Sequence, residues 1–342
     1  MNVSKKSISV TIFFFVLFLF FANSPVIAAR YVLIDDSNVI GELHTVYADP
    51  DKTLVELARE NDLGFDELQL ANPDVDMWVP QAGKQVILPT RFVLPDSKPQ
   101  GIVINLAEMR MFYYTSEYGE KIVYTFPLGI GREGWATPIG ETRVVGKTAN
   151  PTWVPPQSVL EEHAANNDPL PKVVPPGPEN PLGEYALRLD IPGYLIHGTN
   201  KPSGVGMRVS HGCLRMFPED IALLFELVPT GTKVNIVNQP YKIGLHEDKM
   251  LFEVHLPSET NKEKTGLNMA IDLSTIAKNI VDLTDVPVTK KMWDKALELI
   301  NQSQGIPSEI GVIPENLENS PGYFIQLGEF PSVKGAKQMA TF

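Results

Sequence analysis

Cysteine is the scarcest residue in this 342-residue chain, which contains only Cys213. A chain with one cysteine cannot form an internal disulfide, so its fold must be held together by its hydrophobic core. A lone cysteine is either a small buried hydrophobic residue or, in an exported protein, a partner for another chain or a reactive thiol. The count does not separate these readings, so the residues around Cys213 have to decide.

Positive charge is also in short supply. The chain has 29 lysines and arginines against 41 acidic residues, which gives a formal net charge of −12 at pH 7. Nucleic acids and anionic membranes are bound largely through clustered basic side chains. We therefore expect no nucleic-acid partner.

Long apolar runs are absent except at the beginning of the chain. Lys5 and Lys6 precede an apolar stretch over residues 8–22, and small or apolar residues follow up to Ala28. This order is typical of a secretory signal peptide over residues 1–28, cut after Ala28. An uncleaved anchor is the alternative, but the run is shorter than the ~20 apolar residues that span a bilayer. Cleavage removes two lysines, changes the formal charge to −14 and leaves no membrane span.

The chain after Ala28 is long enough for two or three domains, at roughly 100–200 residues each. The first is expected over residues 42–90. Its pattern predicts a strand, two short helices and a closing strand, at 43–46, 52–60, 66–71 and 85–88. Thr53 is a suitable N-cap for the first helix.

This small domain resembles the LysM module, a carbohydrate-binding unit. The resemblance is carried by His44–Val46, Thr53-Leu54, Leu57-Ala58, Leu68, Ala71–Pro73, Pro80, Gly83 and Val86–Pro89. Asp51-Lys52 stands where the module usually has Gly-Asp, in a slightly longer loop. The resemblance implies binding to glycan strands, and a spacer without a ligand is the alternative.

Residues 98–238 are typical of a mainly β domain. Short apolar runs separated by turn residues predict strands at 101–106, 110–115, 121–128, 141–147, 185–189, 194–196 and 234–237. One helix is expected at 218–227, and the whole predicts a sandwich or barrel. The segment 150–181 is dense in proline and has few strand signals. A stretch of this length is usually a lid or binding loop, and an inert insertion is the alternative.

Residues 239–342 form a C-terminal extension of mixed α and β character. A strand is expected at 251–256 and an amphipathic helix at 289–300. The extension contains no recognisable catalytic motif, so the sequence predicts no role for it.

The residues around Cys213 favour a reactive thiol. A thiol nucleophile needs a base, and both His197 and His211 are candidates. His211 stands two residues before Cys213, so the two would share a face if they lay on a strand. His197 requires the tertiary fold to bring it near.

Acyl transfer also needs donors for the developing oxyanion. Gly212 exposes backbone around Cys213, and Arg215 offers a permanent cation suited to a carboxylate. One cysteine and scattered histidines do not have the paired spacing of a structural zinc site. We therefore expect neither a metal nor a cofactor.

The stretch Ile196–Asn200 followed by Ser210–Met216 resembles the signature of the L,D-transpeptidase (YkuD-type) family. Further matches are Thr137–Gly140, Asn150–Trp153, Pro175–Pro178 and Pro218–Ile221. The LysM-like module is similar to that of the family's Gram-negative branch. Glu253-Val254-His255 resembles the start of that branch's C-terminal extension.

The resemblance implies a β-sandwich catalytic domain and a periplasmic enzyme of the cell wall. Cys213 would attack the diaminopimelate carbonyl of a peptidoglycan tetrapeptide stem and release D-alanine, with His197 as base, held by a backbone carbonyl. Amides near His211, Gly212 and Cys213 would form the oxyanion hole. Arg215 would hold a substrate carboxylate or support the site, and Ser210, His211 and Gly198 would shape the pocket. A carbapenem would mimic the substrate.

Three outcomes stay open at this point. The acceptor is an amine, from another diaminopimelate or from the C-terminal lysine of an outer-membrane lipoprotein. Alternatively the acceptor is water, in a carboxypeptidase or a lipoprotein-releasing hydrolase. The third alternative is a peptidoglycan-binding protein without activity, which the presence of Cys213, His197 and Gly212 disfavours.

Overall fold

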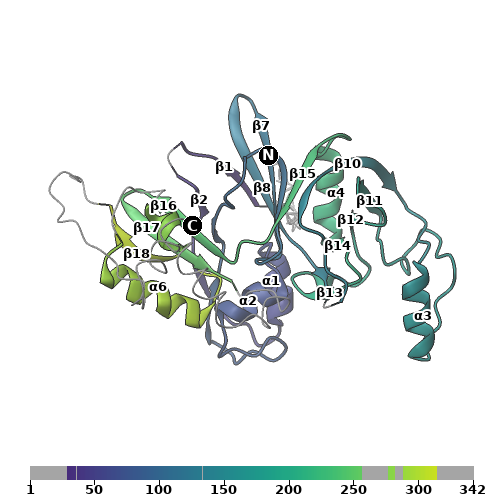
Figure 1. Ribbon diagram of the computed structural model, residues 1–342. Helices are drawn as coiled ribbons and strands as arrows, with labels where there is room; N and C mark the ends of the chain where they lie inside the picture. Colours follow the sequence, from purple (N-terminus) through teal and green to yellow (C-terminus); the bar gives the residue numbers. More distant parts are fainter. Residues whose placement is uncertain (1–28, 36, 133, 256–275, 282–287, 314–342) are drawn as a thin grey trace, which may run out of the picture.

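The computed structural model of the protein describes residues 29–35, 37–132, 134–255, 276–281 and 288–313 (Figure 1). The expected signal peptide therefore lies outside the described residues. None of the described helices has the length and apolar character needed to cross a bilayer.

A nine-stranded sheet forms the centre of the molecule, in the order β1-β8-β7-β6-β15-β10-β11-β12-β14. Its strands are β1 (Ala29–Val32), β6 (Gly101–Asn105), β7 (Arg110–Glu117), β8 (Glu120–Pro127), β10 (Gly140–Ala149), β11 (Tyr185–Leu189), β12 (Leu195–His197), β14 (Leu214–Arg215) and β15 (Lys233–Val237). The mainly β character is thus confirmed. The short strands β1 and β14 were not predicted, because each has too few residues to show an alternating pattern.

The sequence predicted a sandwich of two sheets or a barrel. The structure has instead one sheet of nine strands that curls around its core. The first half of β10, from Gly140 to Arg143, pairs with β15. The second half, from Val144 to Ala149, pairs with β11 and contains a bulge between Val144 and Gly146. A bulge bends and twists a strand, so β10 carries the chain from one half of the sheet to the other. Both halves and helix α4 (Pro218–Leu227) enclose a single apolar core that includes Ile104, Phe126, Leu187, Ile196 and Leu224.

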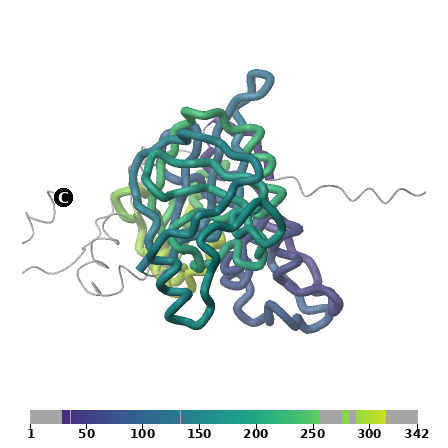
Figure 2. Tube along the Cα trace, turned by 90° about the vertical axis from the view of Figure 1, so that its right-hand side faces the viewer, coloured from purple at the N-terminus to yellow at the C-terminus, as the bar shows by residue number. Residues whose placement is uncertain are grey.

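The proline-dense segment 150–181 contains a helix that the sequence analysis missed. Helix α3 (Gln157–Ala165) begins after Pro156 and stands at one end of the molecule (Figure 1). Only Val159 of this helix is buried, so the segment lacks the wide apolar stripe by which helices are recognised. In Figure 2 this teal segment projects on the same side as the purple module.

The module has the predicted order of elements: β3 (His44–Tyr47), α1 (Leu54–Glu60), α2 (Phe65–Ala71) and β4 (Gln85–Leu88). Thr53 caps α1 as expected, because its hydroxyl accepts a hydrogen bond from the Glu56 amide at 3.2 Å. The module is not an independent unit. Its Leu54, Leu63 and Leu68 share a core with Phe112 and Val123 of the central sheet.

The C-terminal extension forms a separate three-stranded sheet of β16 (Tyr241–His246), β17 (Lys249–Val254) and β18 (Ser308–Val312). The expected strand is β17, two residues earlier than predicted, and the expected helix is α6 (Lys290–Gln302), capped by Thr289. Strands β16 and β18 were not predicted. Further short elements are β2 (Val39–Gly41), β5 (Arg91–Val93), β9 (Ile130–Gly131), β13 (Arg208–Ser210) and the 3₁₀ turn Pro202–Gly204, and residues 276–281 are also helical.

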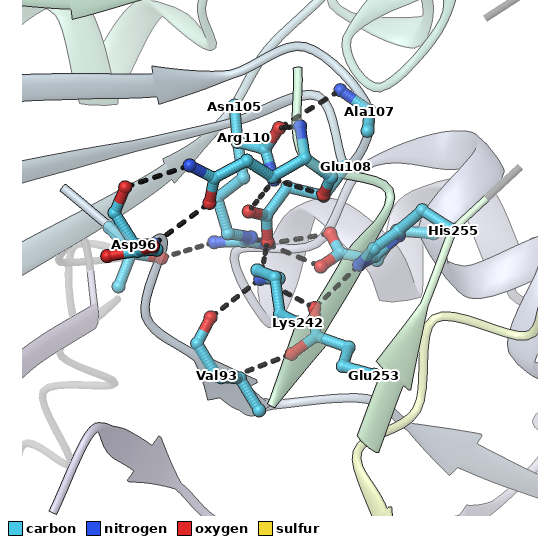
Figure 3. A network of polar contacts seen from close by, with 12 residues as sticks. Val93, Asp96, Asn105, Ala107, Glu108, Arg110, Lys242, Glu253 and His255 are labelled. Atoms are coloured by element: carbon cyan, nitrogen blue, oxygen red, sulfur yellow. Dashed lines mark hydrogen bonds and ion pairs between the residues drawn. The ribbon is translucent and has the colours of Figure 1, made fainter. Parts of the chain in front are cut away.

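A buried ion-pair network joins this extension to the rest of the chain (Figure 3). The Lys242 ammonium donates to the Val93 carbonyl at 2.6 Å and to Glu108 at 2.7 Å, and it lies 2.8 Å from Glu253. His255 Nε2 lies 2.5 Å from the same Glu253 carboxylate. Glu108, Glu253 and His255 are close enough together to hold a metal ion, but the ammonium of Lys242 lies among them. The network therefore holds together β5 (Arg91–Val93), the turn between β6 and β7 of the central sheet, and the extension.

Replacing Lys242 with methionine should destabilise the protein by about 3–5 kcal/mol, because two buried carboxylates would lose their cation. Urea unfolding of the full chain measures the change. Lys290→Met is the matched control, since Lys290 pairs with Asp294 on the surface, where an ion pair contributes at most about 1 kcal/mol. Adding Glu108→Gln to Lys242→Met should recover part of the loss. Equal effects of the two lysine substitutions would refute this role.

Candidate active site

One cavity of about 670 Å³ contains both Cys213 and His197. One part of its lining comes from β12 and from the Cys213 loop, which comprises residues 210–213. The other part, called the cavity wall below, comes from the proline-dense segment 150–181. The wall is mainly apolar, with Trp153, Val154, Val159, Leu170, Pro171 and Val174. Segment 150–181 therefore lines the cavity, and its role as a lid or binding loop stays a prediction.

Neighbouring parallel strands bring Cys213 and His197 to this cavity. In the pairing of β12 with β14, Ile196 lies beside Leu214 and His197 beside Arg215. Cys213 precedes β14 by one residue, so it falls beside Leu195. Leu195 and His197 are two positions apart and share a face of β12. Cys213 and His197 thus become diagonal neighbours although 15 residues separate them in the sequence.

His197 is buried and held as one tautomer. Its Nδ1 lies 2.6 Å from the Gly198 carbonyl oxygen, so Nδ1 carries the hydrogen and Nε2 is left to accept a proton. The orienting group is a backbone carbonyl rather than a carboxylate, as the family resemblance implied. Burial, and then the nearby charge of Arg215, lower the pKa of His197 to about 4. The ring is therefore neutral at physiological pH.

The Cys213 thiol is partly exposed, and its Sγ lies 3.6 Å from the Gly193 carbonyl oxygen. Burial raises its pKa, against the opposing effects of a hydrogen bond with the Leu195 backbone and the charge of Arg215. A raised thiol pKa beside a lowered imidazole pKa favours the neutral pair over a thiolate and an imidazolium. A base then has to remove the thiol proton during attack.

His211 and Cys213 would share a face only if both lay on one continuous strand. The structure has a turn between β13 and β14 instead. Strand β13 ends at Ser210, and Gly212 has φ +101°, which breaks the alternation of side chains. Ser210 Oγ donates to the Cys213 carbonyl at 2.6 Å and accepts from the Gly212 amide at 3.2 Å. Thr137 donates to the Gly212 carbonyl at 2.9 Å. The resemblance implied that the Gly212 amide would be a donor for the oxyanion. In the structure this amide already donates to Ser210, so it is not free for that role.

Arg215 of β14 also lines the cavity, and it has no acidic partner among the described residues. Its Nε is buried and makes no hydrogen bond within them. Burial lowers the pKa of its guanidinium, and Cys213 opposes this effect when its thiol is ionised. A partly buried guanidinium without a carboxylate is suited to bind one from a ligand.

His211 points to different partners from those of His197. Its Nε2 lies 2.9 Å from Glu162 of α3 and 3.0 Å from Arg132, and its ring meets Trp135 edge-on. Arg132 and Glu162 also form an ion pair. Glu162 and Arg132 could not be recognised as site residues from the sequence, because they lie 49 and 79 positions from His211. His211 therefore ties the Cys213 loop to the cavity wall.

These features define a mainly β protein in which a thiol, a neutral imidazole and a guanidinium with no acidic partner in the described part of the chain line one cavity. Residues 99–236 match the family model for the L,D-transpeptidase catalytic domain, YkuD. The chain belongs to the L,D-transpeptidase family, whose members act on peptidoglycan.

Three relatives show the extent of the similarity. Probable L,D-transpeptidase YbiS of Escherichia coli is 39% identical over 269 residues, which cover 77% of this chain and 87% of that protein. Probable L,D-transpeptidase YcfS of Escherichia coli is 40% identical over 267 residues, or 75% and 82% of the two chains. Probable L,D-transpeptidase ErfK/SrfK of Salmonella typhimurium is 34% identical over 304 residues, or 87% and 96%. The similarity therefore extends well beyond the catalytic domain.

Proposed function

We propose that this protein is a cysteine-dependent L,D-transpeptidase that acts on peptidoglycan tetrapeptide stems. The observation that carries the proposal is the cavity in which Cys213, His197 and the unpaired Arg215 come together. The thiol supplies a nucleophile, the imidazole a base and the guanidinium a place for a substrate carboxylate. Family membership supplies the substrate class.

The proposed reaction has two steps. His197 Nε2 accepts the thiol proton while Cys213 Sγ attacks the carbonyl of the L-centre of diaminopimelate. The peptide bond to the terminal D-alanine breaks, the leaving amine takes a proton from His197, and a thioester forms. An amine then attacks the thioester and gives its proton to the imidazole. The C–S bond breaks, and the Cys213 sulfur takes that proton from His197, which restores the neutral thiol and imidazole. We expect the backbone amide of Cys213 to donate a hydrogen bond to the developing oxyanion.

An amine acceptor is favoured over water by the apolar wall of the cavity, which includes Trp153, Val159 and Leu170. Incubation of the purified protein with disaccharide tetrapeptide tests this, with the products identified by mass. Crosslinked dimers are expected, whereas tripeptide alone would show a hydrolase. Adding a lipoprotein with a C-terminal lysine tests the second kind of amine acceptor.

Arg215→Gln should lower kcat/KM for the tetrapeptide by about 10–100-fold, which corresponds to the loss of one charge-assisted hydrogen bond or pair of bonds. Arg215→Lys should lose less, because it keeps the charge but not the planar fork. The control is a tetrapeptide amidated at its C-terminal carboxylate. If Arg215→Gln slows the free and the amidated substrate equally, Arg215 does not bind that carboxylate.

Export to the periplasm and glycan binding by the LysM-like module belong to the same proposal. Because the module shares a core with the central sheet, deleting it would expose that core. A sharper test changes an exposed residue: Trp78, which is 57% accessible and adjoins the exposed Val79. Trp78→Ala should reduce binding to intact sacculi and leave turnover of soluble tetrapeptide unchanged. Unchanged sacculus binding would count against glycan contact at this face.

A further inference from the structure

Two buried aspartates meet outside the candidate active site, where the module packs against α4. Asp62 follows α1, and Asp220 lies in the first turn of α4. They are 5% and 1% exposed, and their carboxyl groups are within hydrogen-bonding reach of each other. Within the described part of the chain, no donor reaches Asp62 Oδ1 or either Asp220 oxygen when both groups are ionised. Burial raises the pKa of Asp62 to about 6 and that of Asp220 well above its ordinary value.

The arginines nearby are already paired with other carboxylates. Arg110 lies 2.7 Å from Glu67, and Arg59 lies 2.7 Å from Glu219. Arg110 also donates to Asp62, but to its backbone carbonyl, at 2.7 Å. The two arginines therefore leave the carboxyl pair without a cation of its own.

One further donor reaches the pair, and it is the backbone nitrogen of Ala29. It lies 2.5 Å from Asp62 Oδ2. Strand β1 holds Ala29 in place, since Ala29 pairs with the buried Thr125 of β8. The Arg30 side chain meets Glu117 at 2.9 Å. Ala29 is also the residue that the sequence predicts as the first of the exported protein.

We propose that Asp62 and Asp220 form the binding site for the α-ammonium group that removal of the signal peptide creates on Ala29. Hydrolysis of the Ala28–Ala29 bond by a signal peptidase adds water, leaves a carboxylate on Ala28 and leaves an amine on Ala29. That amine binds a proton near neutral pH. The amide of the precursor offers one N–H and no charge, whereas the ammonium offers three N–H donors and the missing positive charge.

The site lies behind the candidate active site. Ile221, which follows Asp220 in α4, packs against Gly198. A Cβ atom built onto Gly198 would lie 3.0 Å from Ile221 Cγ2. The Gly198 carbonyl is the group that orients His197. Docking of the new N-terminus therefore stabilises the module, the first strand and the helix behind His197 together, and does so only after processing.

Three forms of the full mature chain test this inference: one with a free Ala29, one extended by Gly-Ser before Ala29, and one with Asp62→Asn. Trace acetylation with acetic anhydride, read by mass spectrometry of the N-terminal peptide, measures the reactivity of the α-amine. The free Ala29 amine should react about tenfold more slowly than in Asp62→Asn, as a pKa one unit higher leaves one-tenth of the reactive amine. The Gly-Ser form should melt several degrees below the free form.

Asp190→Asn is the matched control, because Asp190 pairs with Arg143 on the surface, and it should change neither readout. Equal α-amine reactivity in the free form and Asp62→Asn, or equal melting of the free and extended forms, would overturn the inference. An exported protein whose intact mass does not begin at Ala29 would overturn it as well. The inference rests on the proposed export and not on the proposed reaction, and neither readout requires enzyme activity.

Discussion

Replacing Cys213 with alanine is expected to abolish acyl-enzyme formation completely. Cys213 is the only thiol in the chain, so no second cysteine can substitute for it. The measurement is intact-mass spectrometry after incubation with a carbapenem, which should add to the unmodified protein once and to Cys213→Ala not at all. Cys213→Ser should be nearly as inactive, because a hydroxyl is far harder to deprotonate than a thiol.

The control for this experiment is thermal unfolding of the same samples. The Cys213 side chain is partly exposed, so its truncation to alanine should leave the melting temperature close to that of the unmodified protein. A carbapenem adduct on a folded Cys213→Ala variant would show that Cys213 is not the nucleophile.

Replacing His197 with alanine should slow acylation by a factor of about 10²–10⁴, the usual range for loss of a general base. The effect is expected to be this large because the pKa of Cys213 is raised and very little thiolate exists without the base. The rate of carbapenem addition measures the effect. His211→Ala is the matched control: its ring is held by Glu162, Arg132 and Trp135, so its loss should disturb the cavity wall more than proton transfer. A larger loss from His211→Ala than from His197→Ala would contradict this assignment.

The pH dependence of acylation gives a second test of His197. A base with an ordinary histidine pKa would lose activity as the pH falls through about 6.5. Because burial, with a contribution from Arg215, lowers the pKa of His197 to about 4, the ring stays neutral and acylation should persist at pH 5–6. An acid limb near pH 6.5 in the rate of carbapenem addition would contradict the neutral, buried base.

Local sequence was sufficient for most of the fold. The strands β6, β7, β8, β11 and β15, the helices α1, α2, α4 and α6, and the capping role of Thr53 were all predicted. Each strand has a short apolar run between turn residues, and each helix has an apolar stripe, so either can be read within ten or so residues. Helix α3 was missed because its apolar face is a single buried valine, and β14 because two residues have no period.

Long-range contacts could not be predicted in the same way. The curl of the sheet depends on a bulge in β10, and the shared core of module and sheet joins Leu63 to Phe112. The Lys242 network likewise connects residues that lie up to 160 positions apart. No local period records such pairings, since each depends on where the whole chain folds back.

For the candidate active site, the sequence by itself determined which chemical groups are available: one thiol, two imidazoles near it and one arginine beyond it. The family resemblance implies His197 as the base, and the tertiary structure decides which imidazole lies beside the Cys213 loop. The parallel pairing of β12 with β14 brings His197 beside the Cys213 loop, while the positive φ of Gly212 ends the alternation that would have placed His211 there. Burial in the same fold sets the protonation of His197, because only packing removes a side chain from water and so favours its neutral form.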